Sequence, residues 1–303
     1  MTILPLSDIT PKTHKLRTLK EAFTSGYKIP ETYIIIPPTQ GDLNFLNSLQ
    51  DCTWLIRPSI KESKAGLYGA ICRRDEIEDR VDDVLKHYNE EVDLILQVYI
   101  QSDLAGIMLS SDEVCIESVC GSGYGLTRGG IRPSTYKIKG NEVYTNVILQ
   151  KKKYQMVKGR VTESQCNEFS DIPKKILNEL IEMSDDFKEK IIDWCSKDEE
   201  LYFLEYWPFI KKSDKMVQGT ITNVNSNGEY DILVIPNADI KFYERALKSN
   251  GVISRIGGYL SHLAVICYEK NIPFIISNEE YKDGEVVFLD RDEKKVFRIG
   301  EAI

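Results

Sequence analysis

The chain has 303 residues, and its charged side chains give a formal net charge of −8 at pH 7. An apolar fraction of 42% and a charged fraction of 28% are typical of globular proteins, and the length allows about two domains. The acidic balance argues against general binding of nucleic acids or anionic membrane surfaces. No apolar run approaches the roughly 20 residues of a membrane-spanning helix, and no secretory signal pattern opens the chain. We therefore expect a cytoplasmic protein whose partners are neither membranes nor nucleic acids.

The first 210 residues alternate between strand and helix signals. Short apolar or β-branched runs predict strands at 33–36, 53–57, 94–100, 114–119 and 201–205. Apolar residues at helical spacing predict helices at 14–25, 77–87 and 171–191. The last of these helices is expected to begin with Asp171 as N-cap and Pro173 just inside its first turn.

A polar stretch at 211–216 is predicted to link a domain at 1–210 to a second domain at 217–303. The second domain again alternates between strands and helices. Strands are expected at 217–223, 232–235, 252–254, 274–276 and 285–289, and helices at 239–248 and from 261. This alternation places both domains in the α/β (α+β) class.

His262 carries the sharpest chemical signal in the sequence. It follows the pair Gly257–Gly258, which permits a tight turn with positive φ, and Ser261, which is a good N-cap. A histidine that opens a helix lies beside the positive end of the helix dipole, which favours the neutral, nucleophilic ring. Free N–H groups at a helix start also suit an anion such as a phosphoryl group. The alternative is a histidine that only caps the helix or satisfies a loop carbonyl.

The segment around His262 resembles the phosphohistidine, or swivelling, domain of the family that contains phosphoenolpyruvate synthase, pyruvate phosphate dikinase, rifampin phosphotransferase and glutamine kinase. The family pattern is Thr-x-x-Gly-Gly-x-x-Ser-His-Ala-Ala, followed by Gly-Ile-Pro. Here Ser254 stands at the threonine position, and Gly257, Gly258, Ser261 and His262 match, while Asn-Ile-Pro replaces Gly-Ile-Pro. The resemblance implies that His262 carries a phosphoryl group and that the other four residues support its turn.

Residues 1–210 resemble the ATP-grasp domain of the same family, which implies ATP as the phosphoryl donor. Lys15 stands at the lysine of the family's Lys-Gly-Ala-Asn-Leu opening, so it would reach the nucleotide phosphates. Arg57, in Ile-Arg-Pro-Ser, resembles the arginine of Val-Arg-Ser-Ser, which contacts phosphate. The next loop resembles the family's phosphate-covering loop, where Gly66 and Gly69 let backbone N–H groups approach oxygen anions.

Two further positions resemble nucleotide contacts of that domain. Gln97, in Leu-Gln-Val-Tyr-Ile, lies in a segment similar to the strand that forms the adenine hinge. Glu117 precedes Gly-Ser-Gly-Tyr-Gly, at the place of the acidic residue ahead of the family's Gly-Leu-Gly-Glu. The resemblance therefore adds both residues to the ATP site, whereas Glu117 taken alone is more typical of an exposed strand residue.

A magnesium site is expected because phosphoryl transfer from ATP generally needs Mg²⁺, which prefers a few oxygen ligands. The family has a Glu in Ile-Glu-Trp and, twelve positions later, a Gln in Gln-Ala-Arg-Pro. This chain has Ile-Asp-Trp with Asp193 and, twelve residues on, Glu-Tyr-Trp-Pro beginning at Glu205. The resemblance implies that Asp193 and Glu205 hold the metal; the alternative is that both are merely solvated acids.

Trp207 departs from the family's pattern, which has at that place an arginine that clamps phosphate. The loss of a bidentate donor is either compensated by another arginine, of which Arg57, Arg128 and Arg132 are candidates, or it marks a changed step or an inactive site. On this basis we count Arg132 among the expected nucleotide contacts.

The resemblance implies an ATP-dependent phosphotransferase that passes the β-phosphoryl group of ATP through His262 to an acceptor and releases AMP and orthophosphate. No separate acceptor domain is recognisable, so we expect either a small-molecule acceptor or a separate protein that carries the acceptor site. Two alternatives stay open. One is an ATP-grasp ligase or kinase that forms ADP and uses the C-terminal domain as a scaffold, and the other is an inactive nucleotide-binding subunit that works with a partner.

Overall fold

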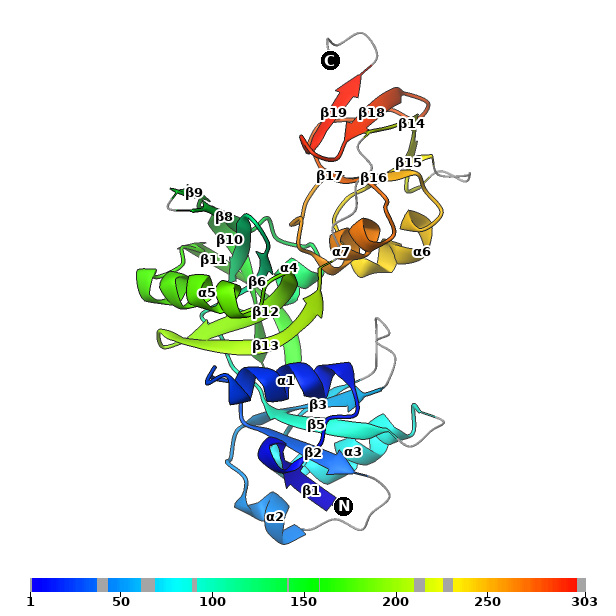
Figure 1. Ribbon diagram of the computed structural model, residues 1–303. Helices are drawn as coiled ribbons and strands as arrows, with labels where there is room; N and C mark the ends of the chain where they lie inside the picture. The colour runs from blue at the N-terminus through cyan, green and yellow to red at the C-terminus, as the bar shows by residue number, and fades with distance from the viewer. Residues whose placement is uncertain are drawn as a thin grey trace. The chain divides into compact units, whose positions relative to one another are not determined.

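The computed structural model describes residues 2–36, 43–60, 69–88, 92–140, 142–157, 159–209, 216–225 and 231–298. These residues form a mixed α/β fold, which confirms the predicted class (Figure 1). By internal contacts the chain divides into two compact units. Unit 1 comprises Met1–Asp103, Gln155–Thr162 and Ile192–Tyr206, and unit 2 comprises Leu104–Tyr154, Glu163–Ile191 and Trp207–Ile303. The predicted linker at 211–216 lies outside the described residues except for Met216, so the predicted domain boundary stays a prediction.

Unit 1 contains a five-stranded antiparallel sheet in the order β1-β2-β5-β3-β4. Its strands are β1 (Thr2–Pro5), β2 (Thr32–Ile36), β3 (Thr53–Ser59), β4 (Ala70–Arg73) and β5 (Asp93–Val98). Its helices are α1 (His14–Thr24), α2 (Leu43–Ser48) and α3 (Ile77–Leu85), with 3₁₀ turns at Leu6–Asp8 and Arg74–Glu76. The predicted helices at 14–25 and 77–87 are thus confirmed, each with a slightly earlier end.

Helices α1 and α3 cover opposite faces of this sheet. Leu16 and Leu19 of α1 pack with Ile34, whereas the apolar side of α3 packs with a cluster that includes Ile35 and Trp54. Neighbouring residues of a strand point to opposite faces, so Ile34 and Ile35 must face different layers. Because both faces of β2 are buried, its consecutive residues can all be apolar.

The hairpin of β12 (Lys190–Lys197) and β13 (Glu200–Pro208) brings two predicted metal ligands into unit 1. Its two linking residues, Asp198 and Glu199, have φ of 51° and 58°. Positive φ at both central residues is typical of a type I′ turn, which matches the twist of antiparallel strands. The hairpin therefore forms although neither turn residue is a glycine.

In unit 2, β6 (Leu104–Ser110), β7 (Val114–Cys120), β8 (Ser134–Lys139) and β9 (Glu142–Asn146) are consecutive antiparallel neighbours. Strands β10 (Leu149–Val157) and β11 (Arg160–Phe169) form a separate two-stranded sheet, of which residues 155–162 are assigned to unit 1. Helix α4 (Tyr124–Thr127) is a single turn, and α5 (Lys174–Asp186) is the longest helix of the described chain.

Helix α5 corrects the predicted helix at 171–191 at both ends. It begins at Lys174 with Pro173 as the N-cap residue. The Asp171 carboxylate does not cap the helix and instead accepts a hydrogen bond from the Tyr136 hydroxyl at 2.5 Å. It ends at Asp186, and Ile191 belongs to β12.

The C-terminal part of unit 2 has a six-stranded sheet in the order β17-β16-β15-β14-β18-β19. The strands are β14 (Met216–Asn223), β15 (Ile232–Ile235), β16 (Gly251–Ser254), β17 (Phe274–Ile276), β18 (Val286–Asp290) and β19 (Lys295–Arg298). The first four pair in parallel, and β18 and β19 add antiparallel pairs. Leu233 and Val252 pack with the helices, while Val234 and Ile253 pack on the other face, so the parallel strands are buried on both sides.

Two helical segments connect these strands. The predicted helix at 239–248 is shorter than expected: Asp239 caps a 3₁₀ turn (Ile240–Phe242) that leads into α6 (Tyr243–Ala246). The predicted helix from Ser261 is α7 (His262–Glu269). Within the described ranges, no helix has the length and apolarity needed to cross a bilayer.

Candidate functional site

The turn that presents His262 has the local structure that the sequence predicts. Gly257 has a φ of 142°, and a Cβ there would lie 2.7 Å from the Ala238 Cβ, so only glycine fits.

The Ser261 hydroxyl accepts a hydrogen bond from the Ala264 N–H at 3.4 Å and caps α7. Asn271, with a φ of 63°, takes the predicted left-handed conformation just after the helix. The Ser254 hydroxyl, at the end of β16, donates to the Ile256 carbonyl at 2.8 Å and tightens the entry to the turn.

His262 is the first residue of α7, and its side chain is exposed. The Trp207 ring lies edge-on to the imidazole, with 6.2 Å between ring centroids and 72° between ring planes. Trp207, which stands where the resemblance implies an arginine, therefore lies beside the predicted phosphoryl carrier. An exposed imidazole at a helix start can reach a substrate, which a histidine enclosed in apolar packing could not.

Glu117, on β7, is buried with 2% of its surface exposed, so it is not an exposed strand residue. Its Oε1 accepts a hydrogen bond from the Tyr259 N–H at 2.7 Å, and its Oε2 accepts one from the Leu260 N–H at 3.1 Å. A Cβ on Gly258 would overlap the same carboxylate. The second glycine of the pair is thus required by the close approach of Glu117, whereas the first is required by its φ. The expected contact of Glu117 with nucleotide stays a prediction.

The Glu117 carboxylate is held at a high electrostatic cost. Burial raises its pKa from 4.5 to about 7, and the two backbone N–H donors and the nearby Lys294 ammonium only partly oppose this rise. Lys294 comes from the turn between β18 and β19, and its ammonium lies 4.1 Å from the centre of the Tyr259 ring. A carboxyl group with this pKa changes its protonation close to neutral pH.

Unit 1 brings four of the predicted site residues together. The Glu205 carboxylate, which is buried, pairs through Oε2 with the Arg57 Nη2 at 2.6 Å and with the Lys15 Nζ at 3.5 Å. Lys15 comes from the first turn of α1, Arg57 from β3, and Asp193 and Glu205 from the β12–β13 hairpin. Residues separated by up to 190 positions therefore meet in one charged cluster, as the resemblance to the ATP-grasp domain implies.

The charges in this cluster are not well compensated. Burial, and then the neighbouring Arg57 guanidinium, lower the pKa of Lys15 to about 8. Burial, and then the Glu205 carboxylate, raise the pKa of Asp193 to about 7. Asp193 as a whole is half-buried, but its Oδ1 is covered and has no hydrogen-bond partner in the described part of the chain. Such an atom favours the arrival of a proton, a donor or a cation.

The remaining predicted residues lie elsewhere or are engaged otherwise. Gly66 is outside the described residues. A Cβ on Gly69 would lie 2.6 Å from the Ile56 carbonyl oxygen, so this glycine permits the close pairing of β3 and β4. The Gln97 side chain is buried and donates to the Thr32 hydroxyl at 2.9 Å, which leaves main-chain groups for any hinge role. Arg132 lines a separate cavity in unit 2.

Comparison with known proteins supports the C-terminal prediction. Residues 228–294 match the family described as "PEP-utilising enzyme, mobile domain", and this segment contains the whole turn and His262. The chain is 22% identical to a protein of Archaeoglobus fulgidus named "Probable phosphoenolpyruvate synthase". That match covers 76% of this chain and 38% of the relative, so the chain spans well under half of the relative's length. The predicted resemblance to PEP-utilising enzymes is confirmed by these matches.

Solved structures of ligases also show similarity. The D-alanine–D-alanine ligase of Bacillus anthracis complexed with ATP is 10% identical, with a TM-score of 0.38, over 64% of this chain and 54% of that one. The D-alanine–D-alanine ligase of Helicobacter pylori is 12% identical, with a TM-score of 0.37, over 66% of this chain and 54% of that one.

Proposed function

We propose that the chain is an ATP-dependent phosphotransferase in which His262 carries the phosphoryl group. The observation that carries this proposal is the exposed imidazole at the first position of α7, within the segment that matches the mobile domain of PEP-utilising enzymes. A neutral imidazole at a helix start is a competent nucleophile toward phosphorus, and the same helix start attracts the incoming anion. The acceptor stays unidentified, since this chain spans 38% of the Archaeoglobus relative.

The proposed chemistry divides one difficult transfer into simpler ones. A ring nitrogen of neutral His262 attacks the β-phosphorus of ATP, and the bond from that phosphorus to the oxygen bridging the α-phosphate breaks, which releases AMP. Water then attacks the terminal phosphorus of the pyrophosphoryl-histidine and releases orthophosphate. The acceptor finally attacks the remaining phosphorus, so the phosphoryl group leaves with it and the imidazole becomes neutral again.

Lys15 and Arg57 are the proposed donors to the nucleotide phosphates. Both now share the Glu205 carboxylate, and burial, followed by the neighbouring Arg57 guanidinium, lowers the pKa of Lys15. A bound polyphosphate would bring further negative charge to these two cations and would raise the pKa of Lys15 again. The cluster is therefore suited to an anionic substrate, and Arg57 adds a planar donor for two oxygens.

Asp193 and Glu205 fit a magnesium ion. Asp193 offers a buried oxygen that has no hydrogen-bond partner among the described residues, and Glu205 is close enough to raise the pKa of Asp193. Within the described residues there is no group of three or more histidine, cysteine or acidic side chains arranged to hold a metal. Two carboxylates suffice for Mg²⁺, because it usually keeps several waters and takes the remaining ligands from phosphate. When bound, Mg²⁺ would neutralise phosphate charge during transfer.

Trp207 favours a second candidate function. An indole has no pair of donors for a phosphate, and its ring lies against the His262 ring where the family has an arginine. A protein that binds ATP but does not transfer phosphorus, and that acts as a subunit of a larger assembly, would tolerate this replacement. The phosphotransferase would consume ATP, whereas the binding subunit would bind ATP without converting it to products.

The test follows ATP and the protein in one reaction. Wild type and His262→Asn are incubated with Mg²⁺ and ATP, products are identified by phosphorus NMR, and intact mass spectrometry looks for an acid-labile adduct of one phosphoryl group. We expect AMP, orthophosphate and the adduct with wild type, and no adduct with His262→Asn. Formation of ADP alone, an adduct that persists in the variant, or ATP binding without any turnover would contradict the phosphotransferase.

A further inference from the structure

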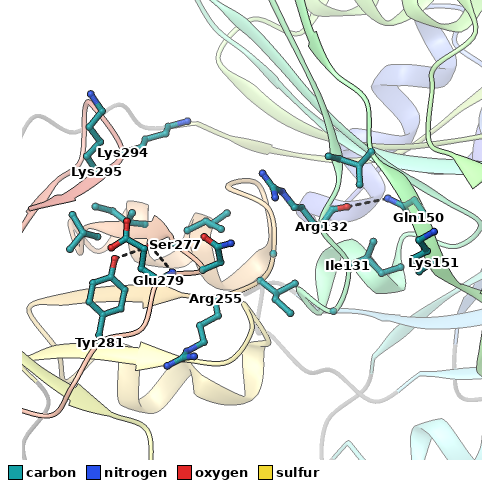
Figure 2. A pocket seen from close by; sticks show the side chains of 18 of the residues that line it. Ile131, Arg132, Gln150, Lys151, Arg255, Ser277, Glu279, Tyr281, Lys294 and Lys295 are labelled. Atoms are coloured by element: carbon teal, nitrogen blue, oxygen red, sulfur yellow. Dashed lines mark hydrogen bonds between the residues drawn. The ribbon is translucent and has the colours of Figure 1, made fainter.

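Unit 2 contains a cavity of about 890 Å³ that the predicted phosphotransfer residues, apart from Arg132 and Gly257, do not line. Figure 2 shows Arg132 and Lys151 on one side of it, and Arg255, Lys294 and Lys295 on the other. The first side comes from the chain after α4 and from β10, and the second from the ends of β16 and β17 and the start of β19. The volume falls within the range of about 300–1,000 Å³ that is common for small-molecule sites.

The cavity is basic although the protein is acidic. The described residues that line it include six cations, namely Arg132, Lys151, Lys152, Arg255, Lys294 and Lys295, and one acid, Glu279. Glu279 is already paired with Arg298 at 2.6 Å. Since the whole chain has a net charge of −8, this concentration of positive charge is a local property of the cavity.

Several of these cations lack a carboxylate partner. Arg132 and Arg255 make no ion pair with the described residues, and Lys151 donates to the neutral Asn167 side chain at 3.2 Å. By contrast, Lys152 and Lys295 are paired with acids at 3.1 and 3.3 Å. A guanidinium without an ion pair among the described residues can offer planar, two-oxygen recognition of a phosphate or a carboxylate, and each side of the cavity has one.

The cavity also has an apolar part. Ile256, which follows Arg255, lines the cavity and leaves 45% of its surface exposed. Ile131 and Ile276 line it as well. A ligand that pairs with the arginines and also covers an exposed isoleucine must combine an anionic group with an apolar body.

We propose that this cavity binds a small organic anion, whose phosphate ester or carboxylate is attracted by the positive charge of Arg132 and Arg255 and whose apolar group contacts Ile256. This site is distinct from the cluster of Lys15, Arg57, Asp193 and Glu205, and its existence does not depend on phosphoryl transfer through His262. The assignment replaces the predicted nucleotide contact of Arg132 with a contact to a second ligand.

The test measures binding of phenyl phosphate to the full chain by isothermal titration calorimetry, in EDTA and without nucleotide. We expect saturable binding that weakens as sodium chloride is raised, because the charges are exposed to solvent. The double variant R132Q/R255Q should raise the dissociation constant by about tenfold or more, since each charged hydrogen bond contributes appreciably to binding. The same titration with benzoate distinguishes a carboxylate ligand from a phosphate ester.

Three matched measurements make the result specific. R73Q/R80Q removes the same charge from exposed arginines of unit 1 and should leave binding unchanged. Ile256→Ser should weaken phenyl phosphate but not inorganic phosphate, which has no apolar group. Binding should persist in Arg57→Gln, which removes only the phosphate contact expected at the cluster of Lys15 and Glu205. The proposal is overturned if wild type shows no saturable binding of phenyl phosphate or benzoate, if R73Q/R80Q weakens binding as much as R132Q/R255Q, or if Arg57→Gln alone abolishes it.

Discussion

The Oε1 atom of Glu117 accepts a 2.7 Å hydrogen bond from the backbone N–H of Tyr259, three residues before the proposed phosphoryl carrier. The other carboxylate oxygen accepts from the next N–H along the chain, that of Leu260. A carboxylate that binds two successive backbone N–H groups occupies the kind of anion site that glycine turns often form. Strand β7 thereby fixes the turn that determines where His262 lies.

Replacing Glu117 by glutamine should loosen this turn. The glutamine side chain keeps one acceptor oxygen but turns an NH₂ group toward the second N–H, which is left unsatisfied at a cost of about 1–3 kcal/mol. We expect faster hydrogen exchange at the Tyr259 and Leu260 amides, measured by mass spectrometry on peptides that cover the turn. Glu113→Gln, an exposed acid just before β7, is the matched control and should leave exchange unchanged. Equal exchange in wild type and Glu117→Gln would contradict the anchoring role.

Gly258→Ala should destabilise the protein through Glu117 specifically. The added Cβ overlaps the Glu117 carboxylate, so the penalty should shrink when Glu117 is also replaced by alanine. Gly257→Ala is the control, because its Cβ meets Ala238 and its φ is left-handed whatever stands at 117. Thermal unfolding of the singles and doubles gives the coupling. A Gly258→Ala penalty that is independent of Glu117 would show that the overlap does not determine the requirement for glycine.

Asp193 should make stability depend on pH. Its pKa is raised from 3.8 to about 7, so between these values the folded protein binds more protons than the unfolded chain, and stability falls as pH rises. Asp193→Asn removes this dependence. The melting temperature of wild type minus that of Asp193→Asn should therefore be higher at pH 5 than at pH 8. A difference that stays constant or has the opposite slope would mean that the Asp193 carboxyl is not held in its neutral form.

Glu205→Gln should have opposite effects on nucleotide binding and on transfer. Without metal, it removes the carboxylate that competes with phosphate for Lys15 and Arg57, so ATP should bind more tightly, by about tenfold if one charged pair is released. With Mg²⁺, phosphorylation of His262 should fall because an oxygen ligand with full negative charge is lost. Fluorescent-nucleotide titrations in EDTA and intact-mass time courses measure the two effects.

Glu200→Gln is the matched control for Glu205→Gln, since Glu200 lies on the same strand but is exposed and pairs with Lys28. It should change neither quantity. Weaker ATP binding to Glu205→Gln in EDTA would mean that this carboxylate supports the two cations and does not compete with phosphate.

The sequence predicts best those features that depend on a few neighbouring residues. The positive φ of Gly257, the cap by Ser261 and the left-handed Asn271 follow from local rules, and the structure has all three. Local rules fail where a distant group competes. Asp171 is a good N-cap by type, yet the Tyr136 hydroxyl takes its carboxylate. The helix after Asp239 ends early, where the Ser249 N–H and hydroxyl both donate to the Ala246 carbonyl.

Contacts between residues that are far apart in the chain cannot be predicted from a single sequence. Glu117 and Tyr259 are 142 residues apart, and nothing in the pattern of β7 indicates that its acid faces a turn and not solvent. The resemblance to the ATP-grasp domain placed Lys15, Arg57, Asp193 and Glu205 in one site because the family brings these positions together. The ion pairs and raised pKa that define their chemistry depend on burial, which is visible only in the fold.

The two amide donors that hold Glu117 impose a thermodynamic reciprocity on the turn. An anion that captured the Tyr259 and Leu260 N–H groups would have to displace the carboxylate, since each N–H has one hydrogen to share. The Glu117 carboxylate lowers the affinity of the turn for such an anion by a certain factor. By linkage, a bound anion lowers the affinity of Glu117 for the two N–H groups by the same factor. Binding of an anion to these N–H groups and attachment of the turn to β7 through Glu117 therefore exclude each other.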